Sequence, residues 1–347
     1  MTALPRLDSR TRIVLTGPSG WIGQAMLAHV AGRTAAAGTA GLALGGQVSA
    51  FASSARVMDL PWGETLPVRA LDTIGPDDVA GAHVIHLAYL TKEKADQLGE
   101  RRFMDTNLAI DDALMGAIEG ARPASLFVAS SGAAALAAAG ADLHPYGVAK
   151  LRQEARFLEW GQRSGVPVIA GRIFNIAGPY INKVESYAIS NMINQAMTAQ
   201  AITIAARVPV FRSFLHVDDL CALALEAGLA GVVRAGPVDM CGAEVVEMDD
   251  LALAVSGALG NNVRILRDPV DTAKTSAYLG NFSQTKALAM QLGLKLSPLP
   301  SCIRDTINWL LDHSSAARTG PVLQSTQQAT KRGSQVRAIL EESSVKS

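Results

Sequence analysis

The sequence predicts an α/β protein in which a doubly wound parallel sheet is joined to a smaller C-terminal lobe. Short apolar segments alternate with segments of helical periodicity through the first half of the chain. This alternation is typical of β-α-β units with right-handed crossovers. After Gly178-Pro179 the alternation ends, and less regular helices and extended segments follow. The chain has 347 residues, 49% of them hydrophobic, which is enough for a large core and two lobes.

The first half begins with a short apolar run that ends at Thr16-Gly17 and is typical of a buried parallel strand. Similar runs follow at intervals, and the complete set of expected strands is 12–15, 48–52, 68–71, 82–88, 125–129 and 166–173. Apolar residues at helical spacing separate them and predict helices at 22–31, 103–120 and 146–164. A Gly/Ala-rich stretch at 35–46 is expected to be a loop.

The second half predicts a smaller lobe. Extended segments are expected at 202–210 and 263–266, and helices at 186–200, 218–229, 248–259, 285–292 and 301–313. We place the first domain at 11–177 with a return segment at about 212–240, and the lobe at 178–211 and 241–313. Residues 314–347 are rich in Ser, Gln, Thr and charge, and this polar tail is expected to be mobile.

Charge and composition exclude several classes of protein. The 31 basic and 31 acidic residues balance, so neither a nucleic acid nor an acidic membrane is an expected partner. No apolar run reaches the roughly 18 residues needed to span a bilayer, and the N-terminus lacks the apolar core of a signal peptide. Cys221, Cys241 and Cys302 follow no metal-ligand spacing. We therefore expect reduced cysteines, no metal and a cytoplasmic location.

Residues 16–23, Thr-Gly-Pro-Ser-Gly-Trp-Ile-Gly, join the first strand to the first helix. Gly17 allows a tight turn, Gly20 lets a pyrophosphate approach the backbone, and Gly23 lets helix and strand pack closely. The following helix N-terminus offers free N–H groups to phosphates. This context predicts a Rossmann-type dinucleotide site, with contacts also from Ser19, Trp21 and Ile22. No Gly-Lys-Ser/Thr ending follows, so ATP or GTP hydrolysis is not expected.

The end of the second strand indicates which dinucleotide is bound. An NAD site normally has an acidic residue there, on the ribose 2′-OH. This chain instead has Ser53, Ser54 and Arg56, and hydroxyls with a guanidinium suit a 2′-phosphate. The sequence therefore favours NADP over NAD, with NAD still open if Arg56 is only a solvated surface charge.

Tyr146 and Lys150 lie four residues apart after Pro145, which suits a helix start. At this spacing both side chains project from one face of a helix. A free tyrosine has a pKa of about 10, and a nearby cation favours the phenolate and moves the pKa toward the working range. The pair is therefore a candidate proton shuttle.

With these motifs the chain resembles the extended short-chain dehydrogenase/reductase family, the NAD(P)-dependent nucleotide-sugar epimerases, dehydratases and reductases. The resemblance covers about residues 11–315 and rests on motifs in a fixed order. Their family patterns are TGxxGxxG, an acidic residue after the third strand, HxA, a Ser at the end of the fifth strand, YxxxK, RxFNxxGP and RDFIHVDD. They correspond in turn to 16–23, Asp72, 86–88, 130–131, 146–150, 172–179 and 212–219.

The resemblance implies a role for each of these positions. Ser131 would orient the substrate oxygen, Tyr146 would be the acid/base, and Lys150 would lower the pKa of Tyr146 and bond the nicotinamide ribose. Further cofactor contacts are expected from Asp72, Leu87, Ala88, Tyr89 and Asn107, besides Tyr146 and Lys150 themselves. Substrate contacts are expected from Ser131, Asn175, Arg212 and Lys274. His86 and His216 are expected to be structural and to bond backbone at strand ends.

Departures from the family pattern narrow the chemistry. Gly132-Ala133 follows the serine where the dehydratases carry an Asp-Glu pair, so 4,6-dehydration is disfavoured, and UDP-glucuronate decarboxylation is disfavoured for the same reason. Tyr89 replaces the usual small residue after HxA, and Asn107 keeps only the first position of the family's NxxGT pattern. The remaining expectation is 4-keto reduction or C4 epimerisation of a nucleotide-activated sugar. A catalytically silent dinucleotide sensor or scaffold of the same fold is the alternative.

By the same resemblance we expect a homodimer formed through the helices at 103–120 and 146–164. Ala149, Ala155 and Leu158 suit such packing, and burial in the core explains them equally well. The sequence names neither the sugar nor the nucleotide.

Overall fold

The computed structural model describes residue 7 and residues 10–36, 44–260 and 263–316. The chain divides into two compact units. The first comprises residues 1–174, 218–240 and 280–295, and the second comprises residues 175–217, 241–279 and 296–347. Each unit is described separately below.

The first unit is built on an eight-stranded sheet with the order β11-β7-β6-β5-β1-β2-β4-β3. All neighbours in this sheet are parallel except the edge pair β3–β4. The strands are β1 (Ile13–Thr16), β2 (Val48–Ala52), β3 (Arg56–Asp59), β4 (Thr65–Ala70), β5 (His83–His86), β6 (Ser125–Ser131), β7 (Val168–Ile173) and β11 (Val238–Met240). The predicted α/β fold with a large, mostly parallel sheet is confirmed.

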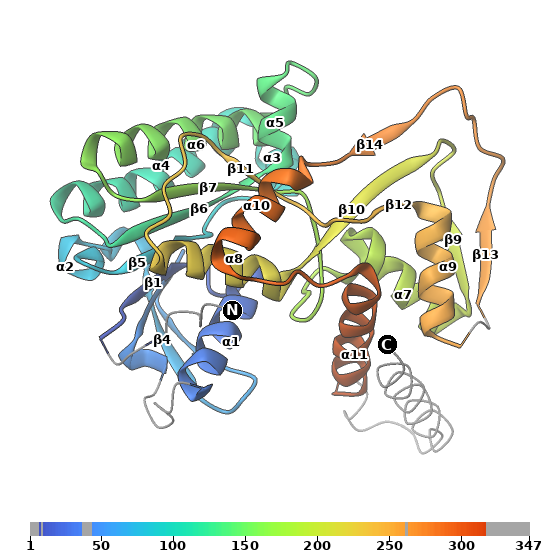
Figure 1. Cartoon of the computed structure of the whole chain (residues 1–347), viewed down its shortest axis with the longest axis horizontal. Coiled ribbons are helices and arrows are strands. Elements are labelled where there is room, and N and C mark those ends of the chain that lie inside the picture. The colour runs from blue at the N-terminus through green and yellow to red at the C-terminus, as the bar shows by residue number, and fades with distance from the viewer. Residues whose placement is uncertain (1–6, 8–9, 37–43, 261–262, 317–347) are drawn as a thin grey trace. The chain divides into compact units, whose positions relative to one another are not determined.

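Helices cover both faces of this sheet, and Figure 1 shows α4 (Glu100–Gly120) and α6 (Pro145–Ser164) together on one face. On the other face α8 (Val217–Leu229) meets α1 (Trp21–Ala36), where the Cys221 Sγ lies 4.0 Å from the carbonyl oxygen of Ile22. The remaining helices of the unit are η1 (Leu44–Gly46), η2 (Leu71–Thr73), α2 (Pro76–Val79), α3 (Lys92–Leu98), α5 (Gly132–Ala138) and α10 (Phe282–Leu292).

The main core lies between the sheet and the α4/α6 layer. Val84, Leu126 and Val128 of the sheet pack with Leu114 of α4 and Phe157 of α6, and each is at most 2% exposed. Strand residues buried in this way read as continuous apolar runs, which is why β1, β5 and β6 were visible in the sequence.

Strand β1 marks the switch point of the sheet, because the chain runs from β1 outward through β2 on one side and through β5 on the other. Thr16 of β1 lies in register with His86 of β5. Ligands of doubly wound sheets bind at the carboxyl ends of the strands at such a point. The glycine turn after Thr16 therefore lies where a dinucleotide site is expected.

The second unit contains two small sheets. In one, β10 (Val210–His216) pairs with β8 (Asn175–Ala177), β12 (Val245–Glu247) and β14 (Ser276–Tyr278), and in the other β9 (Ala201–Ile204) pairs with β13 (Arg264–Arg267). Its helices are η3 (Val184–Ser186), α7 (Ala188–Ala199), α9 (Met248–Ala258) and α11 (Leu299–Ala316).

Several elements differ from the sequence-based expectation. The extended segment expected at 202–210 is two strands, β9 and β10, that belong to different sheets. The expected return segment began at about 212, but β10 clusters with the second unit because its strand partners are there. Residues 280–295 cluster with the first unit, since the side chain of Thr285 in α10 donates a hydrogen bond to the carbonyl oxygen of Asp239 in β11. Most of the predicted tail, 317–347, lies outside the described residues, as does most of the 35–46 loop.

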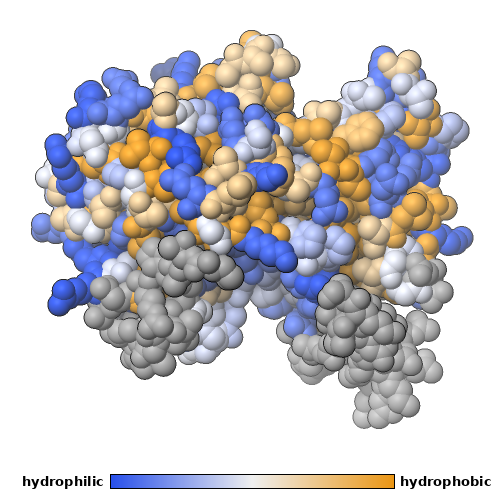
Figure 2. All heavy atoms as spheres, in the orientation of Figure 1, coloured by the Kyte–Doolittle hydropathy of each residue, from blue (hydrophilic) through white to orange (hydrophobic). Residues whose placement is uncertain are grey.

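Hydrophilic and apolar residues are interspersed over the face of the molecule that Figure 2 shows. Within the described part of the chain, no helix combines the length and the apolar character that crossing a membrane would require.

Candidate active site

The glycine turn between β1 and α1 has the backbone geometry that the motif predicts. Gly17 has a φ of +74°, a conformation that favours glycine, and a Cβ there would lie 2.9 Å from the Ala88 nitrogen. A Cβ on Gly23 would lie 2.2 Å from the Gly17 carbonyl oxygen. Both glycines are therefore required by the fold of the turn itself.

Gly20 has a different reason to be glycine. It is exposed, and a Cβ on it would make only an ordinary contact, 3.5 Å from the Gly17 oxygen. The packing of the protein does not require glycine here, whereas close approach of a pyrophosphate to the backbone does. The turn thus fits a dinucleotide, with the N-terminus of α1 directed to its phosphates.

Arg56 lies beside this turn. Its guanidinium donates a hydrogen bond of 2.9 Å to the Ser19 hydroxyl, which joins the start of β3 to the glycine turn. Ser53 and Ser54, in the bend between β2 and β3, are exposed like Arg56. A cation and hydroxyls therefore gather at the end of β2, where the sequence lacks an acid.

Ser131 ends β6 and begins α5. Its hydroxyl oxygen accepts the Ala133 N–H at 3.2 Å and caps the helix. Its side chain therefore lies at the carboxyl end of the sheet, as the Ser131 prediction requires. Gly132 and Ala133 form the first turn of α5 and bring no carboxylate to this position.

Tyr146 lies in the first turn of α6. His144 caps this helix by accepting the Tyr146 N–H at 3.1 Å, and Pro145 follows at the first helical position, as is favoured at helix starts. Gly147 then packs so closely that a Cβ would lie 2.6 Å from the Ala133 carbonyl oxygen. This contact brings the start of α6, with Tyr146, against the turn that follows Ser131.

Lys150 is almost completely buried, with 4% exposure. Its ammonium donates to the Ala129 carbonyl oxygen at 2.6 Å and to the Gln153 side-chain oxygen at 3.0 Å. It also lies 3.6 Å from the centroid of the Tyr89 ring, a cation–π contact. Burial lowers the pKa of Lys150 to about 7, although Asp111 and Glu154 act to raise it.

Tyr89 is therefore close to both members of the pair. Burial raises the pKa of its phenol far above the usual value, and the charges of Asp111 and Tyr146 add to this rise. Tyr89 thus presents a neutral ring to the ammonium. The expectation that Tyr89 narrows the nicotinamide side of the pocket stays a prediction.

Sequence reasoning missed the polar side chains behind Lys150. Gln153 donates to Asp111 at 2.6 Å, Asp111 lies 3.3 Å from His86, and His86 lies 2.8 Å from the Thr16 hydroxyl. His86 bonds two side chains and not the backbone, so that part of the expectation is wrong. The available signal was polar residues, Asp111 and Gln153, at positions where helical periodicity buries a side chain.

The other predicted cofactor residues have diverse settings. Asn107 is buried, and its amide accepts the Leu90 N–H at 2.9 Å and donates to the Phe103 carbonyl at 3.1 Å, so it shapes the segment after β5. Leu87 and Ala88 are half-buried in that segment, while Asp72 is exposed in η2.

The predicted substrate residues of the second unit converge on β10 and β14. Asn175 donates to the carbonyl oxygens of Ser213 and Tyr278 at 3.3 and 3.5 Å. Arg212 is in register with Tyr278, and its guanidinium carbon lies 5.9 Å from the centre of that ring. Burial lowers the pKa of Arg212. Lys274 is exposed just before β14.

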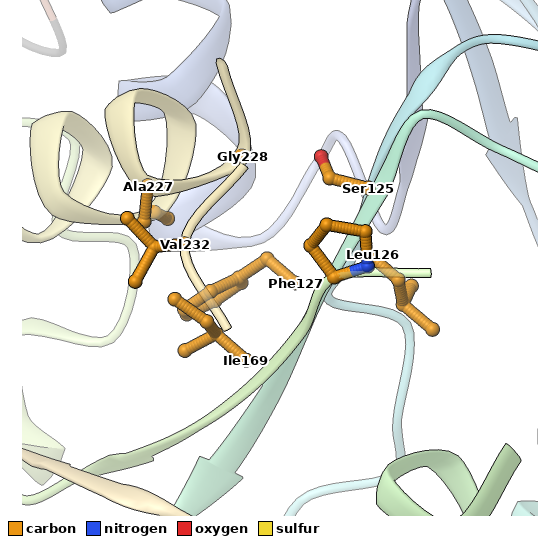
Figure 3. Close-up of a pocket in the computed structure, with 9 residues that line it drawn as sticks. Ser125, Leu126, Phe127, Ile169, Ala227, Gly228 and Val232 are labelled. Carbon is orange, nitrogen blue, oxygen red and sulfur yellow. The ribbon is translucent and has the colours of Figure 1, made fainter. Parts of the chain in front are cut away.

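A small pocket elsewhere in the first unit does not belong to this site. Figure 3 shows it lined by Ser125, Phe127 and Ile169 of the sheet and by Ala227 and Gly228 of α8. Ser125 is the first residue of β6, so the pocket lies at the amino end of that strand. Its walls are mainly apolar, and the ligand-binding end of a parallel sheet is the opposite one.

Comparison with known proteins agrees with this geometry. A sequence profile described as the NAD dependent epimerase/dehydratase family matches residues 13–232. The chain belongs to this family. Since the family's cofactor is a nicotinamide dinucleotide, the glycine turn at Gly17, Gly20 and Gly23 is assigned as a site for NAD or NADP.

The curated relative UDP-glucuronic acid decarboxylase 3 of Arabidopsis thaliana is 25% identical over 126 residues, which is 35% of this chain and 34% of that protein. The match therefore spans only about a third of the decarboxylase.

Two solved structures share the fold over nearly their whole length. UDP-N-acetylglucosamine 4-epimerase from Methanobrevibacter ruminantium M1, in complex with UDP-N-acetylmuramic acid, has a TM-score of 0.67 at 16% identity, covering 87% of this chain and 99% of that one. RMD from Pseudomonas aeruginosa, complexed with NADPH, has a TM-score of 0.62 at 20% identity, covering 87% and 100%.

Proposed function

We propose that this protein is an NAD(P)-dependent oxidoreductase of nucleotide-activated sugars that carries out 4-keto reduction or C4 epimerisation. The observation that carries the proposal is the packing of the α6 start, with Tyr146, against the turn after Ser131, with Lys150 buried one helical turn further on. These are the three side chains that a carbonyl/alcohol interconversion needs.

Each of these residues has a distinct task. The bound dinucleotide supplies or accepts the hydride. Tyr146 donates or accepts the proton on the sugar oxygen, and Ser131 hydrogen-bonds that oxygen and fixes its angle. The Lys150 ammonium favours the phenolate of Tyr146 by its charge.

Elimination and decarboxylation have less support. The turn after Ser131 consists of Gly132 and Ala133, which supply no acid or base beside the sugar. The similarity to a decarboxylase extends over a third of that protein. We therefore propose a reaction that needs only proton transfer on one oxygen.

Asn175, Arg212 and Lys274 are proposed to bind the pyrophosphate of the sugar nucleotide. Arg212 is half-buried near Asn175 and Tyr278, and a guanidinium can bind phosphate oxygens bidentately.

NADP is the proposed cofactor because Arg56 reaches the glycine turn through Ser19. Arg56→Ala should weaken NADPH binding about tenfold or more while leaving NADH binding nearly unchanged. Arg264→Ala, an exposed residue of β13, is the matched control. An Arg56→Ala variant with undiminished NADPH affinity contradicts the NADP preference.

The catalytic assignment is tested with a panel of UDP-, dTDP-, GDP- and CDP-sugars and each cofactor. Tyr146→Phe should lower kcat at least about a hundredfold, whereas Tyr187→Phe, at a half-exposed position of the second unit, should not. Tyr146→Phe with turnover near wild type refutes the assignment. Bound cofactor without turnover of any sugar favours a silent sensor, and tightly retained NAD(H) after purification favours the epimerase over the reductase.

A further inference from the structure

A continuous row of buried polar side chains joins the glycine turn to Lys150. It runs from Thr16 through His86, Asp111 and Gln153 to the Lys150 ammonium, with the contact distances given above. Each of the five residues is at most 4% exposed. Buried polar groups of this kind are costly unless each one is paired.

The contacts of Thr16 fix the proton position on His86. The Thr16 hydroxyl oxygen accepts the N–H of Ala88 at 3.0 Å and that of Leu87 at 3.1 Å, so both lone pairs are used. Its proton must then be donated to Nδ1 of His86. In the neutral imidazole the remaining proton is on Nε2, which donates to Asp111.

The orientation of the Gln153 amide is fixed in the same way. An ammonium can only donate and an ionised carboxylate can only accept, so the Gln153 oxygen faces Lys150 and its NH2 group faces Asp111. Oδ1 of Asp111 accepts both from this NH2 group and from Nε2 of His86. The amide is thus polarised between a negative and a positive group.

Charge pairing among the neighbours leaves Asp111 to Lys150. Glu154, the other buried carboxylate near Lys150, accepts two hydrogen bonds from Arg172 at 2.9 and 2.8 Å and one from Ser130 at 2.5 Å. Its charge is therefore balanced by Arg172.

The remaining groups around Lys150 balance nothing. Tyr89 faces the ammonium as a neutral ring, Tyr146 lies one turn earlier on α6, and strand β6 contributes the carbonyl of Ala129. His86 is a neutral donor to Asp111. The two buried cations and two buried anions thus form two pairs, one direct and one through an amide.

We propose that Asp111 is a positioning residue, the counter-ion of Lys150 acting through the Gln153 amide, and that it holds the ammonium in place for proton transfer at Tyr146. This proposal rests on the proposed function for its consequence in catalysis. The physical link from Asp111 to Lys150 can be measured without any substrate. Neither Asp111 nor Gln153 contacts the reacting atoms in this role.

Asp111→Asn tests the proposal because it removes the charge and keeps an oxygen that can accept from Gln153 and His86. The matched control is Asp112→Asn on the same helix, since Asp112 is 54% exposed and pairs with Arg156 at the surface. The full-length protein is labelled with 13C at the lysine ε-carbons and titrated by NMR, and the Lys150 signal is assigned from its absence in Lys150→Arg.

Since Asp111 raises the pKa of Lys150 against the effect of burial, its loss should lower the titration midpoint of Lys150. The expected shift is about one pH unit downward in Asp111→Asn and none in Asp112→Asn. A midpoint in Asp111→Asn equal to that of wild type overturns the proposal.

If Asp111→Asn does not fold, Gln153→Met replaces it, since this change breaks the amide link and leaves the Asp111–His86 contact. A downward shift supports the proposal, and an unchanged midpoint overturns it. The two proposals fail separately. A shifted midpoint in a protein that turns over no nucleotide sugar refutes only the proposed function, and an unshifted midpoint in an enzyme that requires Tyr146 refutes only the role of Asp111.

Discussion

Gly147→Ala tests whether the contact between α6 and α5 sets the position of Tyr146. An added Cβ would lie 2.6 Å from the Ala133 carbonyl oxygen, whereas ordinary contacts begin at 3.4 Å, so the two helices must separate by about 0.8 Å. Overpacking of this kind costs about 1–3 kcal/mol, and the better helix propensity of alanine offsets at most about 1 kcal/mol. The variant should therefore be destabilised by about 1–2 kcal/mol.

Gly116→Ala is the matched control, because Gly116 is a helical glycine of α4 with open space where its Cβ would lie. The same substitution there should stabilise the protein by about 0.5–1 kcal/mol. Urea denaturation gives both free energies of unfolding, and kcat is measured with the sugar that the panel identifies. Displacement of Tyr146 from Ser131 should lower kcat by about ten- to a hundredfold in Gly147→Ala.

The reasoning is refuted if Gly147→Ala behaves like Gly116→Ala, with a higher free energy of unfolding and unchanged kcat. A loss of stability with kcat unchanged would keep the steric argument and separate it from the placement of Tyr146.

Two further outcomes are expected. Thr16→Val leaves Nδ1 of His86 and the Ala88 N–H without a partner, so the free energy of unfolding should fall by at least about 2 kcal/mol in urea denaturation; a change below about 0.5 kcal/mol would contradict the hydrogen-bond assignment. Burial alone would raise the pKa of Glu247, but hydrogen bonds from Arg267 and from two backbone N–H groups outweigh it and bring the pKa to about 2. Its folded-state pKa is thus below the unfolded value of 4.5, so the stability it contributes is present above pH 4.5 and is lost as pH falls toward 2. Glu247→Gln should remove this component of the acid denaturation profile, and an identical profile for variant and wild type would disprove it.

Elements encoded in short segments were predictable from the sequence. β1, β2 and β6 are apolar runs, and α6 begins at Pro145 and ends before Gly165, whose φ is +71°. The glycine turn was predictable because its conformation depends on neighbouring residues. In contrast β3 and β11, the two edge strands, have only four and three residues, and their short patterns do not stand out from a loop.

The second unit was harder to predict for a related reason. Residues 202–210 look like one extended segment, yet β9 and β10 pair with strands far away in the chain, β13 and β14. Strand pairing of this kind depends on long-range contacts that no local pattern records.

The candidate site shows the same division. The spacing of Tyr146 and Lys150 and the position of Ser131 at a strand end are properties of the sequence. The sequence by itself also determined the dinucleotide turn and the absence of an acid after Ser131. Only the tertiary structure decided that Asp111, His86 and Thr16 stand behind Lys150, because these residues come from three elements far apart in the chain. Burial then makes their pairing obligatory, since a polar group removed from water must find its partner inside the fold.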